Sequence, residues 1–220
     1  MDPMNEKEPL FSPKNVRLLK QPLVKDNPIT VQVLGICSAL AVTVKLEPSV
    51  VISLAVIVVM GFSNVMMSII RNITPPRIRI LVMLTIIAFM VVMVDQVLKA
   101  YMYDVSRQLS VFVGLIITNC IIMGRLEAFA IANKPWPSFL DGVGNAFGYG
   151  WILVVVGFFR ELLGSGTIWD INVIETPWWN LYELGYQNNG LMILPPAALI
   201  VVGVIIWVHR SKHKELLEDN

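Results

Sequence analysis

The feature that most constrains this chain is a series of six apolar segments that together cover most of its length. A helix needs about 20 apolar residues to cross the ~30 Å hydrocarbon core of a bilayer. Backbone polar groups in that core must be paired within the spanning structure, and the absence of two-residue alternation favours helices over barrel strands. We therefore expect transmembrane helices over residues 29–44, 50–70, 78–103, 109–124, 139–160 and 191–208.

The charged side chains lie mainly outside these segments. Of 33 charged residues, nine lie within residues 1–27 and six within residues 210–220. The charged fraction is 15 %, against roughly 25 % in soluble domains, which excludes a soluble globular enzyme. A formal net charge of +1 also argues against a nucleic-acid binder. We expect an all-α polytopic membrane protein: a tail over 1–27, a transmembrane domain over 28–208 and a second tail over 209–220.

The distribution of Lys and Arg between the loops predicts the orientation. If the N-terminus is cytoplasmic, 13 of the 17 basic residues lie on the inner side, and both tails are cytoplasmic. Four basic residues lie on the outer side: Lys45, Lys99, Arg107 and Arg160. An outer loop over 165–188 is rich in aromatic residues: Trp169, Trp178, Trp179, Tyr182 and Tyr186. We expect this loop to lie on the membrane surface or to contact a partner subunit.

The order of the segments predicts an internal repeat. Three segments precede the middle of the chain and three follow it, so the second half lies upside down relative to the first. In transporters built this way, short or interrupted spans at matching positions mark the functional centre. Segments 29–44 and 109–124 occupy matching positions and are short. We expect two inverted three-helix repeats, with helices 1 and 4 short or broken.

The chain has only two cysteines, and they lie in these two matching segments. Counted along helices, Cys37 lies ~12 Å and Cys120 ~13 Å from the inner boundary of the membrane. Buried cysteines are often small packing residues, but thiolates also suit zinc and iron–sulfur centres. Because most iron–sulfur clusters use four cysteines, two cysteines supply half a site and a second polypeptide would supply the rest. A disulfide between the two is a further possibility, although it would lie between spans on no obvious redox path. Packing, a disulfide and metal ligation all remain open at this point.

Polar residues flank the two cysteines: Ser38, Thr118 and Asn119. They can hydrogen-bond to cluster sulfurs and tune the potential, or they can make ordinary hydrogen bonds between helices.

Other polar residues lie in or near the apolar segments. Asp95 suits either a solvated pair with Lys99 or an ion path, and the outer pair Arg160–Glu161 is a similar case. We expect Asp141 at the inner interface, and Gly144 with Gly148 to allow close helix packing. The chain has no Walker loop, H-E-x-x-H motif, nucleophile elbow or Rossmann fingerprint.

Three runs of the sequence resemble a known family. They are LGICSALAVT (34–43), VDQVLKAYMYDVSRQLSVFVGLIITNCIIMGRLEAFA (94–130) and GFFRELLGSG (157–166). These runs are similar to the family of D-type membrane subunits of the bacterial Na⁺-translocating NADH:quinone reductases, and the similarity extends over about residues 27–208. The E-type subunit of the same complex and the membrane subunits of the related ferredoxin:NAD⁺ reductase also carry LG-x-C and TNC elements.

The resemblance implies a multi-pass protein of the bacterial inner membrane. It implies a six-subunit complex that passes electrons from NADH through flavins to ubiquinone and exports Na⁺. Cys37 in LGIC and Cys120 in TNC would be iron ligands of an intramembrane [2Fe–2S] cluster shared with the homologous E-type subunit, across a pseudo-two-fold axis. NADH, flavins and quinone would bind to other subunits, and the isolated chain would catalyse no reaction. The alternatives are a membrane component of the ferredoxin:NAD⁺ reductase and a secondary ion transporter.

Overall fold

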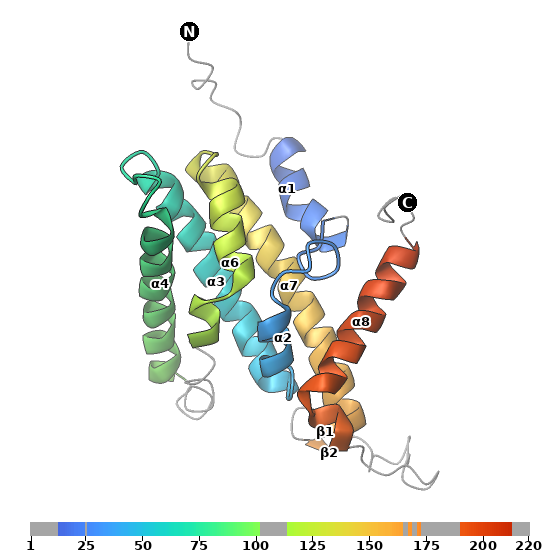
Figure 1. Cartoon of the computed structure of the whole chain (residues 1–220). Helices are drawn as coiled ribbons and strands as arrows, with labels where there is room; N and C mark the ends of the chain where they lie inside the picture. The colour runs from blue at the N-terminus through green and yellow to red at the C-terminus, as the bar shows by residue number, and fades with distance from the viewer. Residues whose placement is uncertain are drawn as a thin grey trace, which may run out of the picture.

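The computed structural model of the chain is a bundle of helices (Figure 1). It describes residues 13–24, 26–101, 114–164, 167–168, 171–172 and 190–212. Within these residues, three helices are long and apolar enough to cross a membrane: α3 (Leu46–Ile70), α4 (Arg79–Tyr101) and α7 (Pro135–Gly164). The arrangement of six spans in two repeats stays a prediction.

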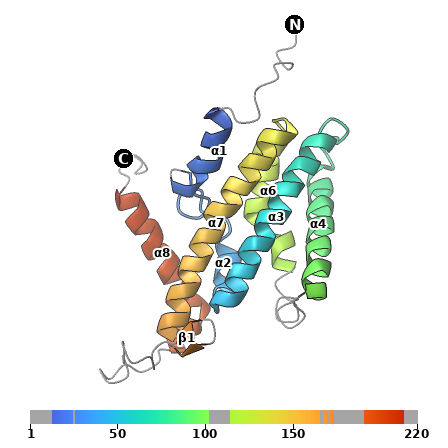
Figure 2. The same ribbon diagram turned by 180° about the vertical axis from the view of Figure 1, so that it is seen from behind.

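Helices α3 and α7 form the centre of the bundle and lie side by side (Figure 2). Small residues allow their backbones to approach closely. A Cβ atom added at Gly142 of α7 would lie 3.0 Å from the carbonyl oxygen of Met60 in α3. At Gly157, nearer the other end of α7, it would lie 2.9 Å from Ser49 Oγ. The two helices therefore form one rigid support for the shorter elements around them.

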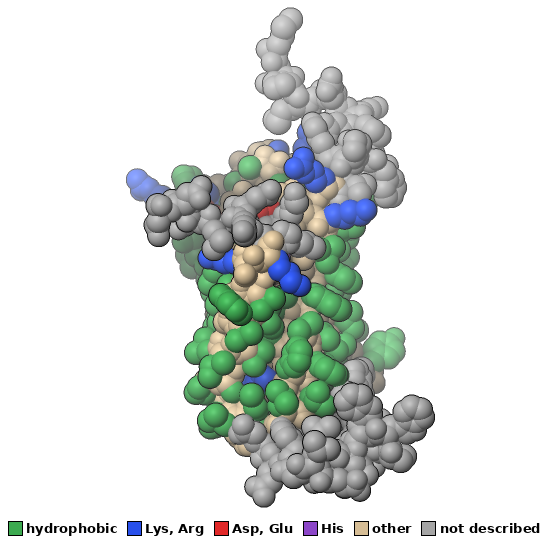
Figure 3. Space-filling view, turned by 90° about the vertical axis from the view of Figure 1, so that its right-hand side faces the viewer, with side chains coloured by type: hydrophobic (Ala, Val, Ile, Leu, Met, Phe, Trp, Pro, Cys, Tyr) green, Lys and Arg blue, Asp and Glu red, His purple; other side chains and the backbone are tan. Residues whose placement is uncertain are grey.

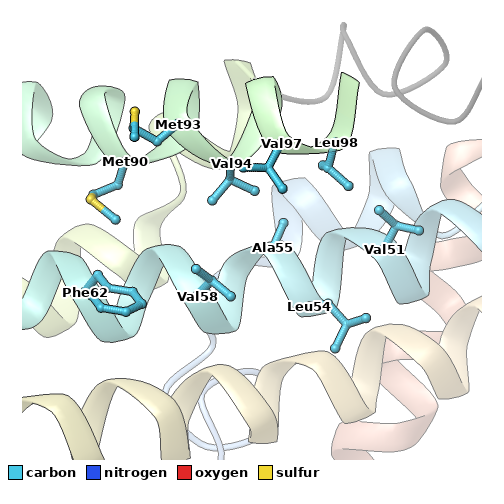
Figure 4. Close-up of a pocket in the computed structure, with 10 residues that line it drawn as sticks. All are labelled: Val51, Leu54, Ala55, Val58, Phe62, Met90, Met93, Val94, Val97 and Leu98. Carbon is cyan, nitrogen blue, oxygen red and sulfur yellow. The ribbon is translucent and has the colours of Figure 1, made fainter. Parts of the chain in front are cut away.

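Helix α4 packs on the outer side of α3 and is largely exposed. Only 22 % of its apolar stretch is buried, against 61 % for α7. Helices α3 and α4 border an apolar groove of about 440 Å³ (Figure 4). Phe62 and Val58 of α3 line one side of the groove, and Met90 and Val94 of α4 line the other. A helix with this exposed apolar surface suits the lipid-facing edge of a bundle.

The N-terminal segment contains a helix, α1 (Pro13–Val24), that packs on α7. A Cβ atom at Gly144 would lie 2.9 Å from the carbonyl oxygen of Leu18, and one at Gly148 would lie 2.5 Å from that of Pro22. The expected close packing at Gly144 and Gly148 is confirmed, with α1 as the partner. Residues 13–24 therefore pack on the bundle, although the sequence assigns them to the N-terminal tail over 1–27.

The expected helix over 29–44 is helical only in its second half, α2 (Ile36–Val42). Turns over residues 26–35 precede it. Asn27 holds these turns: its Oδ1 accepts the N–H groups of Ile29 at 3.0 Å and Thr30 at 3.2 Å, and its Nδ2 donates to the carbonyl of Gly148 at 3.1 Å. Side-chain bonds of this kind supply partners that the missing helical turns would have provided.

The expected helix over 109–124 is also interrupted. Residues 114–117 are helical, the helix stops at Thr118 and Asn119, and α6 (Cys120–Arg125) begins directly afterwards. The Oδ1 of Asn119 caps α6 by accepting the N–H of Ile121 at 3.3 Å. Helix α6 continues as a five-residue π-helix, η1 (Leu126–Ala130). The start of this segment lies outside the described residues.

The C-terminal part begins with a small hairpin after α7. Strand β1 (Thr167–Ile168) pairs with β2 (Ile171–Asn172) in antiparallel register. The five aromatic residues of the outer loop lie outside the described residues. A 3₁₀ turn, η2 (Gly190–Ile193), leads into the last helix, α8 (Pro195–Lys212), which begins later than the segment expected over 191–208.

The connections expected on one side of the membrane lie at one end of the bundle. Figure 1 shows there the start of α1, the loop between α3 and α4, the loop before α7 and the end of α8. The face seen in Figure 3 is mainly apolar, and most of its Lys and Arg side chains lie near that same end. This grouping fits the predicted orientation, while the cytoplasmic location of that end stays a prediction.

Candidate functional site

The structure brings the two cysteines together at the beginnings of two short helices. Cys37 is the second residue of α2, and Cys120 is the first residue of α6. The thiol of Cys120 lies within interaction distance of the thiol of Cys37 and of the backbone of Gly35. Both cysteines are free thiols and both are exposed on the surface of the bundle. A second molecule can therefore reach the pair.

A buried tyrosine of α7 connects the two short helices. The Oη of Tyr149 lies 2.6 Å from Ser38 Oγ and 3.3 Å from Asn119 Nδ2. The hydroxyl of Ser38 donates a hydrogen bond to the carbonyl of Gly35, at 2.9 Å. Tyr149 therefore donates to Ser38 and accepts from Asn119, so each proton in this chain of bonds is used once. Because each cysteine has one of these two polar residues as its neighbour in sequence, the tyrosine joins both sides of the site.

The turn before α2 has an unusual backbone. Gly35 has a φ of +78°, in the left-handed region that glycine adopts without strain. The ring of Tyr149 packs directly against it, and a Cβ atom at this position would lie 2.9 Å from Cε2 of the tyrosine. Val33 also has a positive φ, 57°, which a β-branched residue rarely adopts. These two residues end the preceding turns and orient α2 towards the start of α6.

The three polar residues expected near the cysteines differ in their roles. Ser38 and Asn119 are buried and belong to the network of Tyr149. Thr118 is exposed, and its hydroxyl instead bonds to the carbonyl of Gly114 in its own helix, at 3.4 Å. Tyr149 was not among the residues expected at the site. A signal was present in the spacing of Asp141, Asn145 and Tyr149, which places three polar side chains on one face of α7.

A second polar cluster lies near the C-terminal end of α6. Asp141 is buried, and its carboxylate accepts hydrogen bonds from Arg125 Nε at 3.0 Å and from Arg125 Nη2. Asn145 Nδ2 donates to the same carboxylate at 3.1 Å. Pairing with the arginine allows the carboxylate to be buried within the bundle, and the position of Asp141 at the inner membrane interface stays a prediction. This cluster adjoins a polar cavity of about 270 Å³ between α1 and α7, which Gln21 and Asp26 also line.

The pair Arg160–Glu161 is buried as well, with 1 % and 3 % of the two residues exposed. The Arg160 guanidinium donates to five acceptors: Thr43 Oγ1 at 2.7 Å and the carbonyl oxygens of Leu40 at 3.3 Å, Met192 at 3.1 Å, Ile193 at 2.8 Å and Leu194 at 3.4 Å. Glu161 Oε2 accepts the N–H of Leu46, the first residue of α3, at 2.5 Å. The expected solvated pair is therefore wrong, because helix ends use both side chains as partners.

Arg71 plays a comparable role in the other half of the chain. Directly after α3, its Nη1 donates to the carbonyls of Asn133 at 2.7 Å and Ile131 at 3.5 Å, just beyond η1. Arg160 of α7 binds the end of α2 in the same manner. Each arginine thus comes from the long helix of one half and holds the far end of the short helix of the other half.

Asp95 pairs with Lys99, one turn further along α4, at 2.6 Å. The side chain of Lys99 is 46 % exposed and that of Asp95 is 13 % exposed. This is the ion pair that the sequence predicts, and a role of Asp95 in an ion path stays a prediction.

Comparison with known proteins identifies the family. The model of a family described as "Rnf-Nqr subunit, membrane protein" matches residues 15–206. The chain belongs to the Rnf-Nqr family. Three relatives, each named as the D subunit of a Na(+)-translocating NADH-quinone reductase, come from Shewanella denitrificans, Tolumonas auensis and Photobacterium profundum, and are 52 %, 53 % and 55 % identical to it. The matches cover 93 %, 92 % and 88 % of this chain and 98 %, 93 % and 91 % of the relatives.

The cysteine pair of this Rnf-Nqr protein suits a shared metal site better than a complete one. Among the described residues, no group of three or more His, Cys, Asp or Glu side chains is placed to hold a metal ion. The pair offers two soft ligands, and a [2Fe–2S] cluster takes four. Because both thiols are exposed, ligands from another chain have access to the remaining positions. The donor set therefore fits half of an iron–sulfur site.

Proposed function

We propose that the chain is the D-type subunit of a Na⁺-translocating NADH-quinone reductase in the bacterial inner membrane. The names of relatives that are 52–55 % identical over nearly the whole chain support this assignment. They favour it over the ferredoxin-linked member of the family. Six spans in two inverted repeats and two cytoplasmic termini complete the proposal. The matching positions of Arg71 and Arg160 support the repeats, and the basic end of the bundle supports the orientation.

Within this complex, Cys37 and Cys120 supply two ligands to an intramembrane [2Fe–2S] cluster, and the homologous E-type subunit supplies the other two. The observation that carries this proposal is that two cysteines, distant in sequence, meet on an exposed face of the bundle. When bound, the cluster supplies a one-electron carrier between the flavins and the quinone that other subunits hold.

The residues of this chain prepare the thiols for iron. Both cysteines lie in the first turn of a short helix, where backbone N–H groups have no acceptor within the helix. Ser38 and Asn119 place a hydrogen-bonded polar layer directly beside the thiols.

The proposal is tested in the assembled complex with Cys37→Ser, Cys120→Ser and the double variant. Serine has a similar size, so packing changes less than in a truncation. We expect the iron–sulfur signal of the reduced complex and NADH-dependent quinone reduction to be lost, while electron transfer from NADH to a soluble acceptor persists. Thr118→Ser, two residues before Cys120 and with its hydroxyl bonded to Gly114 of the preceding helical turn, is the matched control and keeps all three readouts.

Two results would overturn the proposal. Near-normal quinone reduction in an assembled double variant would show that the cysteines are packing residues. Two iron atoms in each purified, isolated chain would show that the site is complete without its E-type partner. A secondary transporter with the same fold would be colourless and would give no paramagnetic signal on reduction, which separates the second candidate from the first.

A further inference from the structure

The hydroxyl of Tyr149 is the one group of α7 that bonds to both cysteine-bearing helices within the described residues. It contacts Ser38 of α2 at 2.6 Å and Asn119, the capping residue of α6, at 3.3 Å. The tyrosine is fully buried, so no water competes for these bonds. The spacing of α2 and α6 at the cysteines is therefore fixed from a third element, which is itself held by its long contact with α3.

The direction of the bonds makes this connection specific to a tyrosine. Ser38 donates to the carbonyl of Gly35 and the amide of Asn119 donates to Tyr149, so a group that both donates and accepts is required between them. Phenylalanine would fill the same space and keep the ring contact with Gly35, but it would leave Ser38 and Asn119 without this partner.

The opposite ends of the short helices are already fixed. Arg160 holds the end of α2, and Arg71 holds the segment after η1. Tyr149 is the corresponding tie at the beginning of each helix, where the thiols lie. Its loss would leave each short helix tied at its far end and less restrained at the cysteine.

We propose that Tyr149 is a positioning residue that sets the separation of the Cys37 and Cys120 thiols by tying α2 to α6. It acts through its hydrogen bonds to Ser38 and Asn119. The effect of Tyr149 on the iron–sulfur site rests on the proposed function. Its effect on the separation of the two thiols does not.

The first test uses the full-length chain without a cluster. Copper phenanthroline joins Cys37 and Cys120 in a disulfide by withdrawing two electrons while two protons are released, and a maleimide–polyethylene glycol reagent counts the thiols that remain. We expect Tyr149→Phe to change the rate of disulfide formation at least about fivefold, the factor that corresponds to one hydrogen bond. Tyr101→Phe, at an exposed tyrosine of α4, is the matched control and leaves the rate unchanged.

The second test uses the assembled complex. In Tyr149→Phe we expect the paramagnetic signal of the reduced cluster to broaden and iron to pass to a chelator about fivefold faster, while Tyr101→Phe matches the wild type. Ser38→Ala removes one partner of the tyrosine and keeps the ring. It should reproduce the effect, and the two changes together should be non-additive because they remove the same bond.

The outcomes separate the two proposals. Unchanged crosslinking, unchanged spectra and unchanged iron loss in Tyr149→Phe would overturn the positioning role. A wild-type complex with no iron–sulfur signal would overturn the proposed function, while the crosslinking rates would still decide the role of Tyr149. If Tyr149→Phe fails to assemble, Ser38→Ala carries the same test: wild-type values in all three measurements would refute the inference.

Discussion

Replacing Arg160 by methionine is expected to destabilise strongly the end of the bundle where α2 ends and α8 begins. The guanidinium donates to carbonyl oxygens at the end of α2 and before α8, and to the hydroxyl of Thr43. Methionine fills most of the same volume but donates no hydrogen bond. The variant therefore leaves five acceptors at the junction of three helices without this partner.

The magnitude follows from the bonds that are lost. A hydrogen bond to a charged group contributes about 1.5–3 kcal/mol, so five bonds have a gross value of about 7–15 kcal/mol. Methionine also removes the cost of burying the guanidinium, which amounts to several kcal/mol. We expect a net loss of about 4 kcal/mol or more, which corresponds to a fall in the unfolding temperature of about 8–16 °C for a chain of this size.

The measurement is thermal unfolding of the purified complex in detergent, followed by the solubility of this chain. Arg160→Lys keeps the charge but lacks the planar fork of donors, so it should restore only part of the stability. Arg71→Met is the matched control, because Arg71 is partly exposed and binds two carbonyls instead of five acceptors. Its unfolding temperature should fall by less than half as much.

One result would refute this reasoning. If Arg160→Met and Arg71→Met lowered the unfolding temperature equally, or if neither changed it, the five buried bonds would not hold α2 and α8 together at this end of the bundle. The carbonyls would then have found other partners after a small rearrangement of α2 and α8.

Two further predictions concern the backbone and the topology. Gly35→Ala forces a Cβ atom into the ring of Tyr149 at a φ of +78°, so we expect a stability loss of about 2–4 kcal/mol and reduced iron content. Gly203→Ala is the control and should change neither quantity, because a Cβ atom added there meets no atom within 4 Å. Equal behaviour of the two variants would contradict the expectation. Reporters fused to either terminus should be cytoplasmic and one inserted in the 165–188 loop should be outside, and a C-terminal reporter found outside would eliminate the six-span arrangement.

The long helices were accessible to sequence reasoning because their signal is local. The apolar runs in α3, α4 and α7 exceed the thickness of a bilayer, and their lengths alone separate them from the loops. Their ends were less accessible. Helix α3 begins at Leu46 because Glu161, distant in sequence, accepts its N–H, and no local pattern around residue 46 indicates that partner.

The sequence predicts that the first and fourth helices are short or broken, but it does not predict the residues at which they break. Short apolar runs indicate an incomplete span, whereas the exact start of α2 depends on Asn27 bonding to Gly148 and on Tyr149 packing against Gly35. Both contacts join residues from opposite halves of the sequence. The cysteines were identified because they are the only two in the chain. Tyr149 is one of five tyrosines, so its residue type did not distinguish it from the others.

Charged residues within apolar runs gave the least reliable expectations. A charge near the end of such a run usually indicates the water interface, and Asp95 with Lys99 follows this rule. Arg160 does not, because it finds buried partners on other elements. Composition cannot distinguish the two cases, since the partners become neighbours only in the folded bundle.

Arg160 binds α2 close to Cys37, so a tilt of this short helix moves the thiol only a little. From Leu40, where the arginine binds, to Cys37 the helix rises only about 5 Å, and from Thr43 only about 9 Å. A tilt of about 8° around the anchored end would therefore move the thiol by about 1 Å. A longer helix would amplify the same tilt into a larger displacement. The shortness of α2 thus limits how far thermal motion can separate the two sulfur atoms. Through α2, Arg160 restrains the position of a cysteine that it does not contact.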